Sequence, residues 1–178
     1  MANREALREL QSRLASRLQA ARAEGATQAS WLAVEAAGHK YLFPLTQSGE
    51  IFPFTSTLNV PYTQAWFLGV ANLRGGLYGV VHLSAFASGA PDNTAATEAA
   101  RMQSRLVALN ELLEVNCALL VDRLAGLRGA EAFTASEPPG AQAPAWLGHL
   151  YTDAAGERWQ EINLQALSQQ PEFLSIGA

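Results

Sequence analysis

The stretch that decides the fold is 66–83, which reads W-F-L-G-V-A-N-L-R-G-G-L-Y-G-V-V-H-L. Two apolar runs flank a short N-L-R-G-G corner, and Arg74 carries the only formal charge in the stretch. This pattern predicts a β-hairpin. Because Asn and Gly tolerate positive φ, we expect Gly75 and Gly76 to absorb the strained dihedral angles of the turn. A guanidinium held between rigid strands can brace carbonyls of its own sheet or pair with a carboxylate of a partner, and the sequence leaves both uses open.

Short apolar runs separated by turn residues continue on both sides of this hairpin. They predict an opening hairpin over 31–45, a strand over 50–54, two strands over 105–110 and 115–121 joined across 111–114, and a final hairpin over 146–151 and 158–162. We expect a mobile connection over 87–100, a loop over 134–145 and a short closing helix over 164–169. Many short strands without long helices between them are typical of barrels or a sandwich, so the expected fold class is mainly β.

The N-terminal residues have a different pattern. Residues 3–24 contain no Gly or Pro, and their apolar residues recur every three or four positions, at Leu7, Leu10, Leu14, Leu18 and Ala21. This spacing predicts an amphipathic helix with a narrow apolar stripe and an arginine-rich opposite face. The stripe can fold back onto its own domain or dock on a partner helix, and both readings remain open.

Composition excludes several classes of function. The chain has 178 residues, 49% of them hydrophobic, and a net charge of −4. An acidic body does not suit nucleic acid, which is bound through clustered cations, and no run of about 18 apolar residues predicts a membrane span. The first residues lack the pattern of a secretory signal and the chain has one cysteine, so a cytoplasmic location is expected.

No catalytic or metal-binding constellation is visible in the sequence. The three histidines are far apart along the chain, and Cys117 lies in an apolar run that favours a buried, inert thiol. The glycine-rich phosphate-binding motifs and the G-x-S-x-G nucleophile elbow are absent. We therefore predict no catalytic residues, no cofactor, no metal and no enzymatic activity.

The opening motif, with its surroundings, strongly resembles the CheW-like domain of bacterial chemosensory systems. That family carries the pattern P-x-[WF]-hydrophobic-x-G-V-x-N-L-R-G-x-h-x-P-V-[IV]-D-L. The matching residues are Pro61, Trp66, Gly69, Val70, Asn72, Leu73, Arg74, Gly75, Val80, Val81 and Leu83. Further matches are E-I at Glu50, R-L-V at Arg105, L-L-V-D ending at Asp122, and the final glycine-containing hairpin over 148–159. The likeness spans about 30–170.

The resemblance implies a fold and a function. The family's fold is two small five-stranded β-barrels packed together, here with an N-terminal helical extension over 1–28 and a CheW-like domain over 29–174. Such proteins are non-enzymatic adaptors that link the cytoplasmic hairpin tip of a chemoreceptor to the regulatory domain of a CheA-type histidine kinase, within membrane-associated receptor arrays. Length and composition are most similar to the PilI-type coupling proteins of type IV pilus twitching motility.

The resemblance also implies which residues bind protein partners. Carried over position by position, the family's partner contacts fall on Ser48, Glu50, Asn72, Leu73, Arg74, Gly75, Leu106, Leu124 and Leu127. Taken individually, each of the four leucines is more often a core residue than an interface residue.

Two residues depart from the family pattern, Gly79 in place of Pro and His82 in place of Asp. Imidazole accepts through one nitrogen only, so a locally altered turn is expected after His82, without a functional role. Two other functions remain as alternatives, a small-molecule or lipid-binding β-barrel with an unfilled lumen and a hydrolase with a scattered site.

Overall fold

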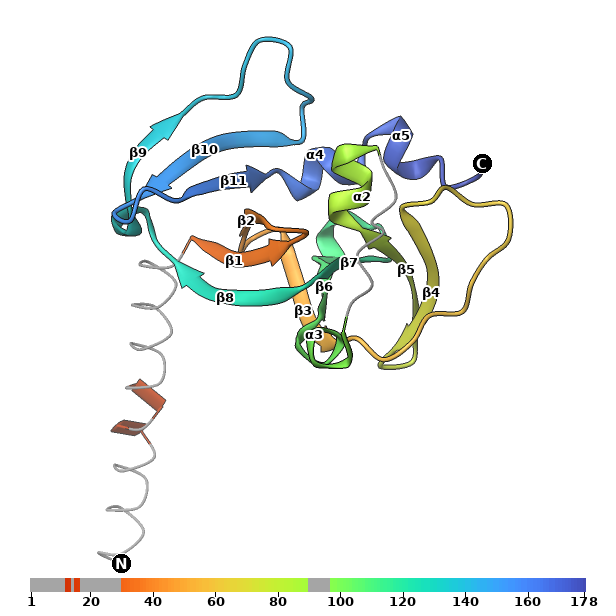
Figure 1. Cartoon of the computed structure of the whole chain (residues 1–178). Coiled ribbons are helices and arrows are strands. Elements are labelled where there is room, and N and C mark those ends of the chain that lie inside the picture. Colours follow the sequence, from red (N-terminus) through yellow and green to blue (C-terminus); the bar gives the residue numbers. More distant parts are fainter. Residues whose placement is uncertain (1–11, 14, 17–29, 90–96) are drawn as a thin grey trace, which may run out of the picture.

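The structure is a computed structural model, and it describes residues 12, 13, 15, 16, 30–89 and 97–178. Two curved sheets stand next to each other (Figure 1). The six-stranded sheet has the order β8-β1-β2-β11-β10-β9, formed by Arg123–Arg128, Trp31–Ala36, His39–Pro44, Arg158–Ile162, Leu147–Asp153 and Phe133–Glu137. The five-stranded sheet has the order β3-β6-β7-β5-β4, formed by Ser48–Pro53, Arg105–Leu109, Cys117–Val121, Gly76–His82 and Phe67–Leu73. The chain crosses between the two sheets directly from β2 to β3 and from β7 to β8.

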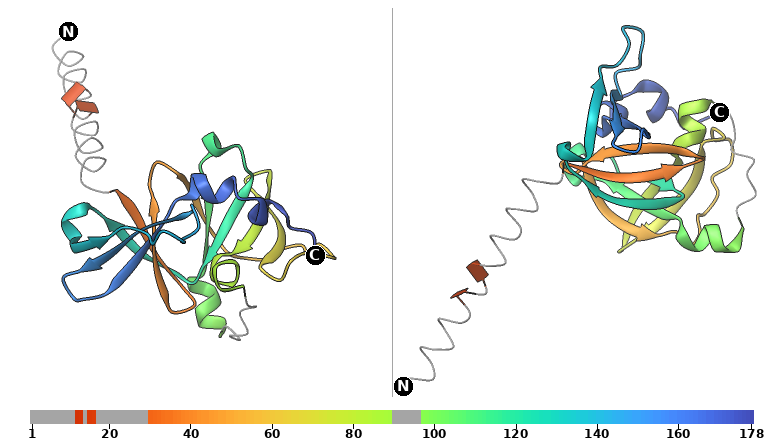
Figure 2. Two further views of the ribbon diagram at one scale, coloured as in Figure 1. Left: turned by 90° about the horizontal axis from the view of Figure 1, so that it is seen from above. Right: turned by 60° about the vertical axis from the view of Figure 1, so that its left-hand side comes forward.

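The helices of the described chain are short. Within 30–89 and 97–178 they are α2 (Leu83–Ser88), α3 (Glu98–Gln103), α4 (Leu164–Ser168) and α5 (Pro171–Leu174), with two 3-10 turns at Glu111–Leu113 and Ala130–Ala132. The helices α4 and α5 lead from the six-stranded sheet across to the five-stranded one (Figure 2). There Gly177 bridges Thr63, which fixes the C-terminal end against the long loop before β4.

The mainly β, two-sheet architecture predicted from the sequence is confirmed, and one of the two sheets has six strands where five were expected. The hairpins over 31–45, 66–83 and 146–162 and the closing helix over 164–169 also form. Of the predicted helix over 3–24, the described residues 12, 13, 15 and 16 are helical; the rest of it, and the question of where it docks, lie outside the described residues.

Two stretches predicted to be irregular contain regular structure within their described residues, and one strand was not predicted at all. In the connection predicted over 87–100, α2 extends to Ser88 and α3 begins at Glu98, while residues 90–96 lie outside the described residues. The strand β9 forms inside the predicted loop over 134–145; it is an edge strand whose polar T-A-S-E residues are all exposed, so the apolar alternation of a buried strand is missing. The strand β8 was not predicted because Gly126, at φ 98°, lies beside a β-bulge that interrupts the alternation of its side chains.

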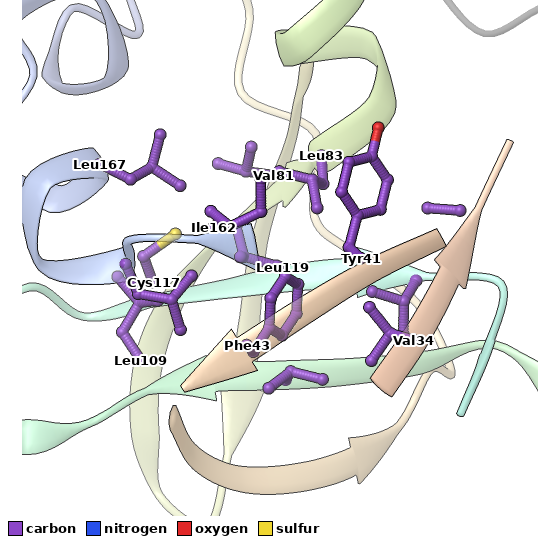
Figure 3. Close-up of a cluster of buried hydrophobic side chains, with 14 of the residues drawn as sticks. Val34, Tyr41, Phe43, Val81, Leu83, Leu109, Cys117, Leu119, Ile162 and Leu167 are labelled. Atoms are coloured by element: carbon purple, nitrogen blue, oxygen red, sulfur yellow. The ribbon is translucent and has the colours of Figure 1, made fainter. Parts of the chain in front are cut away.

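Alternation of side chains divides the interior into three clusters. In β7, Cys117, Leu119 and Val121 face the core between the sheets, whereas Ala118 packs inside the five-stranded sheet. Side chains from both sheets and from α4 meet in the shared core (Figure 3). Trp31, Ala33, Leu42 and Trp159 fill the inside of the six-stranded sheet in the same way. Both sheet interiors are therefore occupied by the protein's own side chains, which argues against the alternative of a ligand-binding lumen.

Candidate protein-binding site

Arg74 lies at the tip of the β4–β5 hairpin, in a turn tighter than the sequence suggested. Leu73 pairs with Gly76, so Arg74 and Gly75 are the two central residues, with φ values of 49° and 79°. These are the φ signs of a type I′ turn, the turn that suits the twist of a hairpin. The prediction that Gly76 shares the strain was wrong; Gly76 is already in β5, and Arg74 itself takes the left-handed conformation. The Asn72 Oδ1 atom accepts a hydrogen bond from the Gly75 N–H at 2.9 Å, which stabilises the turn.

The Arg74 side chain reaches the opposite edge of the five-stranded sheet. Its Nη2 atom lies 2.8 Å from Glu50 Oε1 on β3, and its side chain is 76% exposed. Since β3 and β4 are the two edge strands of the curved sheet, this ion pair connects its two edges. An exposed ion pair adds at most about 1 kcal/mol to stability, so the pair fixes where the guanidinium points more than it holds the fold. The remaining donors of Arg74 face solvent.

A pocket of about 280 Å³ lies behind the ion pair, lined by Glu50, Arg74, Leu73, Tyr78 and Glu111 among others. Two large exposed side chains at the same end of the sheet were not predicted as site residues. They are Leu77, next to the turn, and Leu112, which is 85% exposed in the β6–β7 connection. In the sequence, the position of Leu77 directly after the turn is the one signal that could have identified it as a site residue; Leu112 has no such signal. We call Glu50, Asn72, Leu73, Arg74 and Gly75 the turn surface.

Two of the predicted contact residues are buried. Leu106 is 1% exposed and packs inside the five-stranded sheet with Val80 and Ala118. The Ser48 side chain is also buried, and its hydroxyl donates to the Pro44 carbonyl at 2.7 Å. Direct contact of either side chain with a partner was therefore a wrong prediction for this conformation; both residues support β3 and β6 from within.

Leu124 and Leu127 lie on a different part of the molecule, the edge strand β8 of the six-stranded sheet. They are 37% and 61% exposed, and β8 pairs with β1 on one side only. We call Leu124 and Leu127 the β8 surface. Apart from the buried Ser48 and Leu106, the structure thus divides the predicted contact residues into a turn surface on one sheet and a β8 surface on the other.

The start of β8 is held by polar contacts to the β1–β2 hairpin. Arg123 donates from Nε and Nη2 to the two carboxylate oxygens of Glu35, at 2.7 and 2.8 Å. The hydrogen bond from Arg123 is the main cause that lowers the pKa of the Glu35 carboxyl. Asp122, at the end of the L-L-V-D motif, accepts from the Ala37 N–H at 2.7 Å in the β1–β2 turn. Asp122 and Arg123 therefore fix the start of β8 against the β1–β2 hairpin.

His82 acts as the N-cap of α2. Its Nδ1 atom accepts from the Ala85 N–H at 3.3 Å and lies 2.9 Å from the Ser84 hydroxyl. This agrees with the locally altered turn expected after His82, because one imidazole nitrogen replaces the carboxylate of the family's usual Asp as the capping acceptor. Ser84 is buried, so this Ser–His contact caps a helix and offers no accessible nucleophile. Gly79 donates its N–H to the Asn116 carbonyl at 2.9 Å, a hydrogen bond that the family's usual Pro cannot make.

The described residues offer little chemistry. In that part of the chain no three His, Cys, Asp or Glu side chains come close enough together to hold a metal ion. Burial raises the pKa of the Cys117 thiol to about 12, which keeps it protonated and unreactive. None of the described helices combines the length and the hydropathy of a membrane span.

The sequence profile of the CheW-like domain family matches residues 30–172. The chain belongs to the CheW-like domain family. Among solved structures, it is similar to the scaffolding protein TtCheW from Thermoanaerobacter tengcongensis, with a TM-score of 0.61 and 17% sequence identity. The superposition covers 76% of this chain and 88% of that one, and at this identity it shows the CheW-like fold alone. A comparison with curated proteins returned no match.

Proposed function

We propose that this CheW-like protein is a non-enzymatic adaptor that couples a chemoreceptor to a CheA-type histidine kinase. The observation that carries the proposal is the separation of the turn surface and the β8 surface, which lie on different sheets. Because the two sheets share one packed core, the chain can hold two partners in a fixed relative orientation. The partners proposed are the receptor's cytoplasmic hairpin tip and the kinase's regulatory domain.

The turn surface has the features of an interface anchor. A planar guanidinium, aimed by Glu50 and flanked by exposed leucine side chains, suits a partner that offers a carboxylate or backbone carbonyls within an apolar rim. We propose Glu50, Asn72, Leu73, Arg74 and Gly75 as one contact and Leu124 and Leu127 as the other.

The finer assignments follow from the same resemblance. We propose that residues 29–174 form the adaptor domain, that residues 1–28 are an extension to it, and that the protein acts in type IV pilus twitching motility of the PilI type. An adaptor with these partners works in the cytoplasm at receptor arrays.

Binding of the full-length chain to the cognate kinase regulatory domain tests the proposal. Arg74→Ala removes the anchor and is expected to weaken binding by about 1 to 3 kcal/mol. Arg74→Gly is the matched control for the turn, because glycine loses the same side chain but relaxes the positive φ. Equal loss of binding in both variants assigns the effect to the guanidinium. No binding by the wild-type chain to the kinase domain or to the receptor hairpin would refute the adaptor function.

A further inference from the structure

Most Lys and Arg side chains of the described domain have a carboxylate or an aromatic ring as a partner, but two arginines have neither. Residues 30–178 carry seven Lys and Arg side chains. Four of them pair with carboxylates, namely Lys40, Arg74, Arg123 and Arg158. Arg128 lies over the Trp159 ring, 5.1 Å from its centroid. Within the described chain, Arg101 and Arg105 are left without an acidic partner; Arg101 lies in α3, and Arg105, four positions later, is the first residue of β6.

Arg105 is nevertheless held in a fixed position. Its Nη1 atom donates to the Met102 carbonyl at 2.8 Å and to the Ser104 carbonyl at 2.9 Å, so the side chain caps the C-terminal end of α3. Neither bond neutralises its charge, and neither uses Nε or Nη2. The guanidinium is therefore pre-organised and keeps part of its donor fork for another acceptor.

Arg105 and Arg123 line one pocket of about 290 Å³, together with Gln103 and Leu124. The Nε and Nη2 atoms of Arg123 are bound to Glu35, whereas its Nη1 atom takes no part in that pair of hydrogen bonds. Two guanidinium groups against one carboxylate leave a net positive pocket, on a domain whose other cations are mostly neutralised. Leu124, part of the β8 surface, supplies an apolar wall.

We propose that this pocket binds a carboxylate side chain, an Asp or Glu of the partner protein that covers the β8 surface. The acid lies between the free donors of Arg105 and Arg123, while the apolar part of the partner segment packs on Leu124. Charge-assisted hydrogen bonds from arginine to carboxylate give both strength and orientation, so the pocket selects acidic partner segments and sets their register along β8. The identity of the occupant rests on the proposed adaptor function; the affinity of the pocket for carboxylate does not.

The first experiment tests the pocket alone. The arginine Nε–Hε signals of the full-length, ¹⁵N-labelled chain are followed by NMR during titration with succinate, with sodium chloride as a control at equal ionic strength. The expected result is a saturable shift of the Arg105 and Arg123 signals. The Arg158 signal should not shift to the same extent, and the Arg105→Gln variant should lose the saturable shift. Equal shifts at all arginines, or none, would overturn the proposal.

The second experiment tests the occupant. Affinities of the full-length chain for the receptor hairpin fragment and for the kinase regulatory domain are measured at several salt concentrations. Arg105→Gln is expected to weaken binding to the partner of β8 by about five- to thirty-fold and to reduce the salt dependence. Arg158→Gln, which removes an arginine paired with Glu137, is the matched control and should stay within about two-fold of wild type.

The two experiments separate the possible failures. If succinate binds but Arg105→Gln leaves both partner affinities unchanged, the pocket takes a free carboxylate and the proposed occupant is wrong. If the wild-type chain binds neither partner while succinate still saturates the pocket, the adaptor function is refuted. The proposed Asp or Glu of a partner protein is then refuted as well, but the affinity of the pocket for carboxylate is confirmed.

Discussion

At the residue scale, Gly69 is the position where the backbone tolerates least change. Its φ is 123°, and a Cβ atom there would lie 2.2 Å from the Leu58 carbonyl oxygen, which belongs to the loop bridged to Val70. A bulge in β4 at this point lets the loop approach the edge of the sheet.

Gly69→Ala is therefore expected to lower the free energy of unfolding by about 2 to 4 kcal/mol, since it combines strain with a backbone clash. Chemical denaturation measures the change. Gly140→Ala is the matched control, because Gly140 has open space around it, and its effect should stay within about 0.5 kcal/mol. Equal stability of the two variants would contradict the assigned close approach.

Glu35 gives the protein a predictable response to acid. Its pKa is lowered from 4.5, first by the hydrogen bond from Arg123. A carboxyl whose folded-state pKa is depressed contributes stability above its unfolded pKa and loses it as pH falls through the folded value. Glu35→Gln should therefore destabilise the protein at pH 7, and its deficit relative to wild type should shrink as pH falls below 4.5. Denaturation curves at pH 7, 4.5 and 3 test this, and a deficit independent of pH would contradict it.

At the element scale, α2 is a six-residue helix that depends on its cap. His82 Nδ1 satisfies the Ala85 N–H, one of the donors that a helix start leaves free. We expect His82→Ala to cost about 1 kcal/mol of unfolding free energy, and His82→Asn to retain more of the wild-type stability because its amide oxygen can cap the helix. Thermal unfolding at pH 7.5 measures both; an alanine variant as stable as the asparagine variant would remove the capping role.

The elements also show which signals the sequence contains. Buried strands such as β1, β6 and β7 alternate between two cores, and their continuous apolar runs are readable. The edge strands β8 and β9 were missed. In β8, Gly126 interrupts the alternation of apolar and polar side chains, and in β9 that alternation is missing because both faces are exposed. Helix α2 depends on a histidine cap, which sequence rules for helix starts do not include.

The candidate site was predictable in the same uneven way. The motif around Arg74 identified the turn surface, but its ion pair with Glu50 joins the two edges of a curved sheet, and such closure is not encoded in local spacing. Leu106 fitted the family pattern equally well, yet it is buried, because a motif does not show which face of a strand points outward.

At the scale of the whole molecule, a shared core joins two sheets that carry different exposed surfaces. Trp66, Phe86, Trp146 and Phe173 extend this core under the C-terminal helices, with Trp66 stacked on Phe173 at 6.1 Å between ring centroids. A packed body of this kind can hold two partners in a fixed relative orientation without any covalent chemistry, as the proposed function requires. The central claim is that two partners occupy it together.

The most direct test is a three-component binding measurement. The kinase regulatory domain is added to saturation, and the affinity of the receptor hairpin fragment for the occupied adaptor is compared with its affinity for the free one. We predict that both bind at once, with Arg74→Ala and Leu127→Asp each weakening a different partner by about ten-fold. Mutual exclusion of the two partners, or loss of the same partner in both variants, would contradict the account.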